Sequence, residues 1–328
     1  MKRVALSLIA GAVTLALTAC NGEAGVDGSN GVNGSDGANG TNGSDGTNGV
    51  DGANGVDGKN GGSGLTRLAT VPAGAEVTGI FLSNGGDLFF NVQHPSDTNT
   101  AKDSVNGKVI DRGTVGVLRG VNFNNLPRNI INSPVPESEF ERQTVIAALG
   151  EYQILGQTGD TYAELGDSGL AGGLGVHYGI NNNQKIIENN NPDFNGFIAA
   201  GENEGYLFTN WESYPGGVSR LKMSKSAEGA WSVTDAMMIN FDAVKGTAAN
   251  CFGSVSPWGT PLTSEEWIVN STVNSTTDAS WNDPSDTGTD GIEALVAPDF
   301  PNPYRYGYIA EIQKPMTDAP EVVKHYTI

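Results

Sequence analysis

The sequence has little cysteine, histidine or positive charge. Its 328 residues contain two cysteines and three histidines, and the formal net charge is −19 at pH 7. A protein that binds nucleic acid needs a basic face, so this charge argues against that class of partner. The acidity suits a protein that gathers divalent cations, and it suits simple solubility equally well.

The N-terminal apolar run, residues 4–17, is too short to span a bilayer, for which about 20 residues are needed. It follows Lys2 and Arg3 and ends in L-T-A-C, which resembles the lipobox of bacterial lipoproteins. We therefore predict a lipoprotein signal peptide over 1–19 and lipidation of Cys20, which anchors the mature chain to a membrane. An ordinary cleaved signal is the alternative. Asn21, rather than Asp, follows the cysteine and favours the outer membrane of a Gram-negative host.

The glycine-rich segment lacks proline. From Gly22 to Gly61 a glycine recurs at every third position, which is the G-x-y period of collagen-like sequences. Without proline a triple helix is weak, and the many Asn and Asp residues favour turns. We interpret 20–65 as a flexible stalk that follows the lipid anchor. A short collagen-like assembly, and with it a trimer, is the open alternative.

Residues 66–328 form the predicted domain, which is long enough for a sizeable core. Helical patterns are few, and the best candidate is 138–149. Short aromatic and β-branched runs bounded by Gly, Asn, Asp and Pro predict strands at 79–82, 87–92, 205–210, 230–233 and 306–312. This pattern predicts an all-β fold, a sandwich or a propeller. The Gly/Asp turn that leads into a strand at 83–92, with a similar pattern at 201–208, favours the propeller.

Several catalytic motifs are absent. The sequence has no P-loop, no dinucleotide fingerprint, no H-E-x-x-H and no paired C-x-x-C. The G-D-S-G at 166–169 is similar to a serine-protease nucleophile loop, but Leu170 replaces the next glycine and we interpret it as a loop. A group of acids offers oxygen ligands for Ca²⁺, but its spacing does not fit an EF-hand and favours a solvated loop: Asp283, Asp286, Asp290 and Glu293.

The stretch at 250–267 combines a thiol with two carboxylates. If Cys20 is lipidated, Cys251 has no disulfide partner within the chain, and it is then either a small buried hydrophobe or a ligand. The Pro-Trp-Gly turn at 257–259 predicts that Cys251 and the Glu265–Glu266 pair lie at two strand ends. A thiolate beside carboxylates is favourable when a cation lies between them. One thiolate among carboxylates suits iron better than calcium alone.

The pattern N-C-x-G-x-x-x-P-W-G-T-x-L-T-x-E-E at 250–266 is similar to the signature of PhoX-type alkaline phosphatases. Other segments also resemble this family: 75–79 with 91–95, 189–194 with 206–212, 217–219 with 229–231, and 305–312. The resemblance implies a β-propeller whose central iron–calcium cluster hydrolyses phosphate monoesters. Carried over residue by residue, it implies that Cys251 binds iron and that Asn210 contacts phosphate or a metal. The implied metal carboxylates are Glu76, Glu212, Glu265, Glu266 and Glu311.

The sequence departs from the family pattern in four places. Trp211 replaces the histidine of the family's N-H-E, and Ser264 replaces a cysteine. The 75–95 segment comes first here although it closes the family's chain, which implies a circular permutation. The chain stops soon after Glu311, so we expect an incomplete propeller. Two functions are therefore expected: a surface-anchored phosphatase-like module, inactive if it is a fragment, or a non-catalytic propeller lipoprotein that binds a ligand or scaffolds the envelope.

Overall fold

The computed structural model describes residues 65–165, 170, 172–179, 185–213, 215–266 and 306–325. The predicted signal peptide, the predicted lipidation site Cys20, the G-D-S-G loop and the acids at 283–293 lie outside the described residues. So does the predicted stalk, except for Leu65. No helix among the described residues is long and apolar enough to span a membrane. Apart from Leu65, the described residues all belong to the predicted domain.

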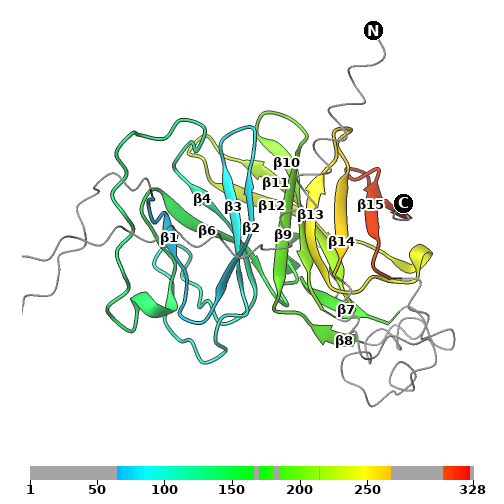
Figure 1. Ribbon diagram of the computed structural model, residues 1–328, viewed down its shortest axis with the longest axis horizontal. Helices are drawn as coiled ribbons and strands as arrows, with labels where there is room; N and C mark the ends of the chain where they lie inside the picture. The colour runs from blue at the N-terminus through cyan, green and yellow to red at the C-terminus, as the bar shows by residue number, and fades with distance from the viewer. Residues whose placement is uncertain are drawn as a thin grey trace, which may run out of the picture. The chain divides into compact units, whose positions relative to one another are not determined.

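Nearly all of the regular secondary structure in the described domain is β-strand, as the sequence predicts. Three four-stranded antiparallel sheets dominate it (Figure 1). Blade 1 contains β2 Glu76–Leu82, β3 Leu88–Gln93, β4 Thr114–Arg119 and β6 Glu151–Gln157; blade 2 contains β9 Pro192–Ala199, β10 Glu204–Trp211, β11 Gly217–Lys225 and β12 Trp231–Met238; blade 3 contains β13 Asn250–Val255, β14 Pro261–Glu265, β15 Ile309–Gln313 and β16 Glu321–His325.

Shorter elements complete the described fold. Two small antiparallel sheets pair β1 Ala69–Thr70 with β5 Ile146–Ala147 and β7 Val176–Tyr178 with β8 Lys185–Glu188. Single 3-10 turns lie at Glu141–Gln143, Ala163–Leu165 and Asp242–Val244.

The three large sheets are arranged as propeller blades. The first strand of each blade is an edge strand of its sheet, and β9 packs against both β2 and β13. In Figure 1 these three strands lie side by side near the centre. They are thus the innermost strands, as in a propeller, where successive sheets pack face to face around an axis. Among the described residues the ring does not close, so the fold is an incomplete β-propeller.

Side chains along β10 alternate between its two faces and fill the spaces on both sides of blade 2. Leu207 and Trp211 pack into the core between blades 1 and 2, together with Phe89 of β3. Tyr206 and Phe208 point to the other side and pack against blade 3. Because both faces of β10 are buried, apolar or aromatic side chains occur on both of them. The same alternation sends Thr209 and Asn210 to opposite sides.

The Gly/Asp turn before β3 joins two blades. Asp87 is buried, and its Oδ1 accepts hydrogen bonds from Lys225 Nζ at 2.6 Å and from Trp231 Nε1 at 3.4 Å. The ring of Trp231 packs edge-on against Phe197, and Phe197 stacks on Phe89. The polar turn and the aromatic strand that follows it therefore hold blade 1 against blade 2.

The predicted helix at 138–149 is wrong. Glu141 Oε2 accepts the backbone N–H groups of Glu137 and Ser138, and the 3-10 turn that follows ends at Thr144, which is extended. Ile146 then pairs with Thr70 in a short sheet. Tertiary pairing thus overrides the local helical preference of this segment. The predicted strands at 79–82, 87–92, 205–210 and 230–233 are present, and the last predicted run begins as a strand only at Ile309.

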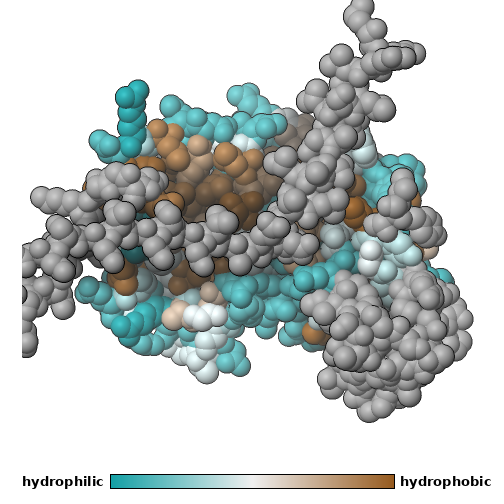
Figure 2. Space-filling model, viewed as in Figure 1, coloured by the Kyte–Doolittle hydropathy of each residue, from teal (hydrophilic) through white to brown (hydrophobic). Residues whose placement is uncertain are grey.

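The innermost strand of blade 1 carries an apolar surface. Val77, Ile80 and Leu82 of β2 are exposed, and Ile80 keeps 68% of its accessible area. Figure 2 shows an apolar region with hydrophilic residues on both sides, over the part of the face where Figure 1 labels β2, β3 and β4. The three exposed residues lie on the strand that begins at Glu76, one of the predicted metal carboxylates.

Candidate metal centre

Each blade brings two side chains to the same rim of the fold. One side chain comes from the start of the innermost strand, and the other comes directly after the end of the second strand. Because these two strands are antiparallel neighbours, the start of one lies beside the end of the other. The pairs are Glu76 with His94 in blade 1, Asp193 with Glu212 in blade 2, and Cys251 with Glu266 in blade 3.

Three of these side chains converge. One ligand atom from each of Asp193, Glu212 and Cys251 lies within 4.8 Å of the other two. All three residues are partly buried. Gln93 Nε2 donates to Glu212 Oε2 at 3.4 Å, and the charge of Glu266 acts on both carboxylates. We call Asp193, Glu212 and Cys251 the rim cluster. Three ligand atoms that lie this close together suit a bound cation.

The environment of the rim cluster disfavours negative charge on every member. Burial raises the pKa of the Cys251 thiol strongly, and the hydrogen bond and charge of Asp193 raise it further. Burial also raises the pKa of Asp193 and of Glu212, and Glu266 adds repulsion to both. Several acidic side chains lie close together here, so their negative charges repel one another. A bound cation reverses this preference by stabilising the ionised forms, so the donor set fits a metal ion.

Blade 1 contributes the outer part of the site. His94 Nε2 lies 3.6 Å from Glu76 Oε1, and both side chains are largely exposed. The charge of Glu76 raises the pKa of Asp193, so the two carboxylates interact. His94 has a positive φ of 37°, which is uncommon for a residue with a β-carbon. The Glu76–His94 pair is thus more exposed than the rim cluster, with Glu76 close enough to Asp193 for the two charges to interact.

Polar side chains buried between blades 1 and 2 hold Asp193 in place. Thr209 Oγ1 donates to Asn195 Oδ1 at 2.6 Å, and Asn195 Nδ2 donates to Asn91 Oδ1 at 2.8 Å. Asn91 Nδ2 in turn donates to the backbone oxygen of Asp193. The network is fully buried, which makes such hydrogen bonds rigid and costly to break.

Gly79 allows β2 to approach Asp193. Its φ is 59°, and a β-carbon there would lie 2.1 Å from the backbone oxygen of Asp193. The close approach therefore requires glycine. Asn195 Nδ2 also donates to Gly79 O at 3.0 Å, which links this point to the buried network.

Asn210 is the residue predicted to contact phosphate or a metal, and in the structure its side chain contacts the backbone of β13. It is buried, and its Nδ2 donates to the backbone oxygens of Cys251 at 2.9 Å and Phe252 at 3.1 Å. Both donor hydrogens of the amide are accounted for by these bonds. Asn210 thus positions the strand that carries the thiol.

The hairpin of β13 and β14 brings Cys251 beside Glu266. Its turn contains Trp258, and the two residues lie at its open end, as the sequence predicts. A side-chain hydrogen bond joins Cys251 to Glu266. The structure does not bring Glu265 to the cluster. Its carboxylate is buried and accepts hydrogen bonds from Lys324 Nζ, Ala248 N and Tyr308 N at 2.9–3.0 Å.

Glu311 also lies apart from the rim cluster, beside the turn at the closed end of the hairpin. Its Oε1 accepts from Trp258 Nε1 and Thr260 Oγ1, both at 2.6 Å, and its Oε2 lies 2.9 Å from His325 Nε2. Although burial opposes it, this set of donors lowers the pKa of Glu311 to about 2. The carboxylate fastens the turn to β15.

Two family models match parts of this chain. Residues 216–327 match the family model of alkaline phosphatase PhoX. This part of the chain is similar to PhoX and includes Cys251 and Glu266, whereas Asp193 and Glu212 precede it. Residues 19–67 match the model of the collagen triple helix repeat, so the expected resemblance to PhoX with a collagen-like stalk is confirmed. No curated protein and no solved structure matches the chain.

Sequence reasoning missed Asp193 and His94. Both lie in segments that resemble PhoX, Asp193 in N-P-D-F and His94 in Q-H-P. A comparison of positions could have found Asp193, because it lies at the start of β9 just as Cys251 lies at the start of β13. Glu76, Glu212, Glu266 and Cys251 were predicted, and the structure places all four at this rim.

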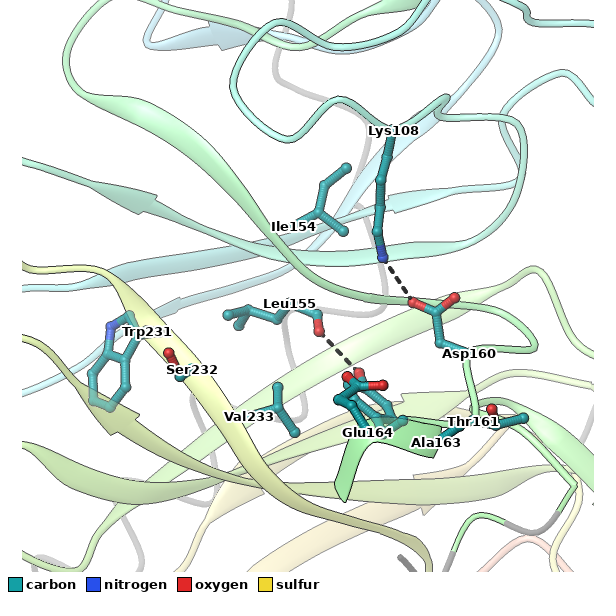
Figure 3. A pocket seen from close by; sticks show the side chains of 11 residues that line it. Lys108, Ile154, Leu155, Asp160, Thr161, Ala163, Glu164, Trp231, Ser232 and Val233 are labelled. Atoms are coloured by element: carbon teal, nitrogen blue, oxygen red, sulfur yellow. Dashed lines mark hydrogen bonds and ion pairs between the residues drawn. The ribbon is translucent and has the colours of Figure 1, made fainter. Parts of the chain in front are cut away.

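A pocket lies away from the rim cluster, between the outermost strands of blades 1 and 2 (Figure 3). Its volume is about 490 Å³, and Trp231 and Tyr162 are among the residues that line it. Lys108 and Arg112 pair with Asp160 at 3.2 and 3.3 Å. Asp160 is thus paired with two cations, unlike the acids of the rim cluster, which lie beside other acids.

Proposed function

We propose that the rim cluster binds metal ions and that the chain is a phosphatase-like protein whose iron and calcium hydrolyse phosphate monoesters. The observation that carries the proposal is the convergence of Asp193, Glu212 and Cys251 within 4.8 Å, from two blades. The similarity of 216–327 to alkaline phosphatase PhoX supports the reaction class.

The donor set assigns roles to this chain's residues. Cys251 supplies a soft thiolate, which suits iron, while Asp193 and Glu212 supply oxygens. Glu266 and Glu76 add carboxylates nearby, and calcium prefers such oxygen ligands. When bound, metal ions neutralise the phosphate oxygens and activate the attacking water. The residues hold the ions and keep the rim electronegative.

A second function has one observation in its favour. Trp211 stands where the PhoX pattern has a histidine, and it is fully buried, with Nε1 donating to Ser219 Oγ at 2.9 Å. This position therefore supplies no imidazole to the rim. A non-catalytic propeller lipoprotein that binds a ligand or scaffolds the envelope is the second candidate.

The proposal includes a location. Lipidation of Cys20 would anchor the chain in the outer membrane, and the stalk at 20–65 would follow the anchor. The match of 19–67 to the collagen repeat supports an extended stalk, and a trimer through this segment belongs to the proposal. Phosphate esters outside the cell membrane are then the substrates.

The test uses the full chain, purified and loaded with iron and calcium. Metal content is measured together with hydrolysis of an aryl phosphate, and chelator-stripped protein is the control. Turnover that depends on the metals supports the phosphatase. Full metal occupancy without turnover supports the second candidate and contradicts the first. A chain that binds neither metal contradicts the phosphatase.

A further inference from the structure

The two glutamates that close the signature, Glu265 and Glu266, lie in different environments. Glu266 interacts with Cys251 at the rim, whereas the side chain of Glu265 is fully buried. Glu265 Oε1 accepts from Ala248 N and from Lys324 Nζ, both at 3.0 Å, and its Oε2 accepts from Tyr308 N at 2.9 Å. One carboxylate thus joins β16, the residue before β15 and the segment that leads into β13.

The segment held by Glu265 leads directly to the thiol. Ala249 follows Ala248 with a positive φ of 44°, a strained conformation for a residue with a β-carbon. Ala249 N donates to Ser213 O at 2.7 Å, and Ala249 O accepts from Glu266 N at 2.8 Å. Ser213 directly follows Glu212. The strained residue is therefore hydrogen-bonded to the backbone of Glu266 and to that of Ser213, the neighbour of Glu212, and Cys251 lies two residues further on.

We infer that Glu265 is a positioning residue, which holds the strained turn at Ala249 and thereby aims Cys251 and Glu266 at a shared metal ion. This inference rests on the proposed function. Strain of this kind persists only where surrounding contacts enforce it, and buried hydrogen bonds to a carboxylate are strong. Glu265 binds no metal; it sets the geometry of residues that do.

Glu311 provides a matched control. It also belongs to the buried residues, since each of the two glutamates keeps 5% of its accessible area, and its carboxylate also accepts several hydrogen bonds in blade 3. It lies at the closed end of the hairpin, beside Trp258, whereas Glu265 lies at the open end. Replacing either glutamate removes a buried carboxylate from the same sheet, but only Glu265 contacts the segment that leads to Cys251.

The test titrates the full chain and its Glu265→Gln and Glu311→Gln variants with Co²⁺ alone, reading the thiolate-to-cobalt absorption band. Replacing residues that support metal ligands weakens affinity roughly 10- to 100-fold, and we expect this for Glu265→Gln together with a weakened band. Glu311→Gln should bind cobalt as the parent does. Equal loss in both variants, or no loss in either, overturns the inference.

A second readout needs no metal. The rate at which iodoacetamide alkylates Cys251 in the folded, metal-free chain is followed by mass spectrometry of the peptide. We expect a changed rate in Glu265→Gln and the parent rate in Glu311→Gln; an unchanged rate in Glu265→Gln overturns the positioning role. A parent that binds no cobalt contradicts the proposed function instead. If Glu265→Gln alone does not fold, the double variant Glu265→Gln/Lys324→Met replaces it. The double variant leaves no unpaired buried charge, because both members of the Glu265–Lys324 ion pair have become neutral.

Discussion

Asp193 and Cys251 lie at the starts of the innermost strands of neighbouring blades, and their ligand atoms lie within 4.8 Å of each other. Neither strand could form this site alone. The packing of β9 against β13 brings the two residues together, and Glu212 joins them because β10 runs antiparallel to β9. The candidate metal centre is therefore a product of how blades 2 and 3 pack.

The approach of β2 to Asp193 predicts a large cost for Gly79→Ala. A methyl group there would meet the Asp193 oxygen at 2.1 Å and the Asn91 amide at 2.4 Å, in a backbone conformation that favours glycine. We expect a loss of unfolding free energy on the order of 3 kcal/mol, measured by urea denaturation. Gly74→Ala is the control, since Gly74 also has positive φ but has nothing within 4 Å. Its cost should stay at about 1 kcal/mol. Equal costs would show that the close approach is not tight.

Glu212→Gln should weaken metal binding without destabilising the metal-free chain. The carboxylate repels Asp193 and Glu266, so its neutral analogue removes repulsion, but it also removes a charged ligand. We expect at least about a tenfold loss of Ca²⁺ affinity by calorimetric titration, equal to ~1.4 kcal/mol. Glu204→Gln, at the exposed opposite end of β10, should bind as the parent does. A metal-free variant that melts well below the parent would contradict this account of the repulsion.

His177 should make the domain less stable in mild acid. Burial lowers its pKa from 6.5 to about 4, against an opposing hydrogen bond to the Gly216 backbone. Between pH 6.5 and about 4, His177 is therefore protonated in the unfolded chain but neutral in the folded chain. The contribution of His177 to the free energy of unfolding is therefore fully present above pH 6.5 and is lost as the pH falls towards 4.

The size of this effect can be measured. Between pH 7 and pH 5 the free energy of unfolding should fall by about 2 kcal/mol because of this residue. His177→Asn removes the titrating group, so the variant should show a shallower pH dependence over the same range. An identical pH dependence in both proteins would assign the effect to other groups.

Strand positions could be predicted from the sequence because they depend on local patterns. Leu88–Gln93 and Glu204–Trp211 are apolar, aromatic and bounded by turn residues. The segment at 138–149 shows the limit, since pairing of Ile146 with Thr70 decides its structure from more than seventy residues away. Such pairings leave no local signal.

The candidate site divides in the same way. The signature located Cys251 and Glu266, because one hairpin brings them together. Which glutamate of the pair faces inward could not be predicted, since Lys324 and Tyr308, which fix Glu265, come from other strands or connections. Asp193 was missed because its proximity to Cys251 depends on the packing of two blades.

The most direct test of the candidate metal centre is the iron content of the purified chain and of Cys251→Ser. The serine keeps the size of the side chain and removes the thiolate, so the fold should remain while the soft ligand is lost. We predict that iron copurifies with the parent chain and is lost from Cys251→Ser, whereas calcium is retained at least in part. Equal iron in both proteins, or none in the parent, would contradict the assignment of Cys251 as an iron ligand.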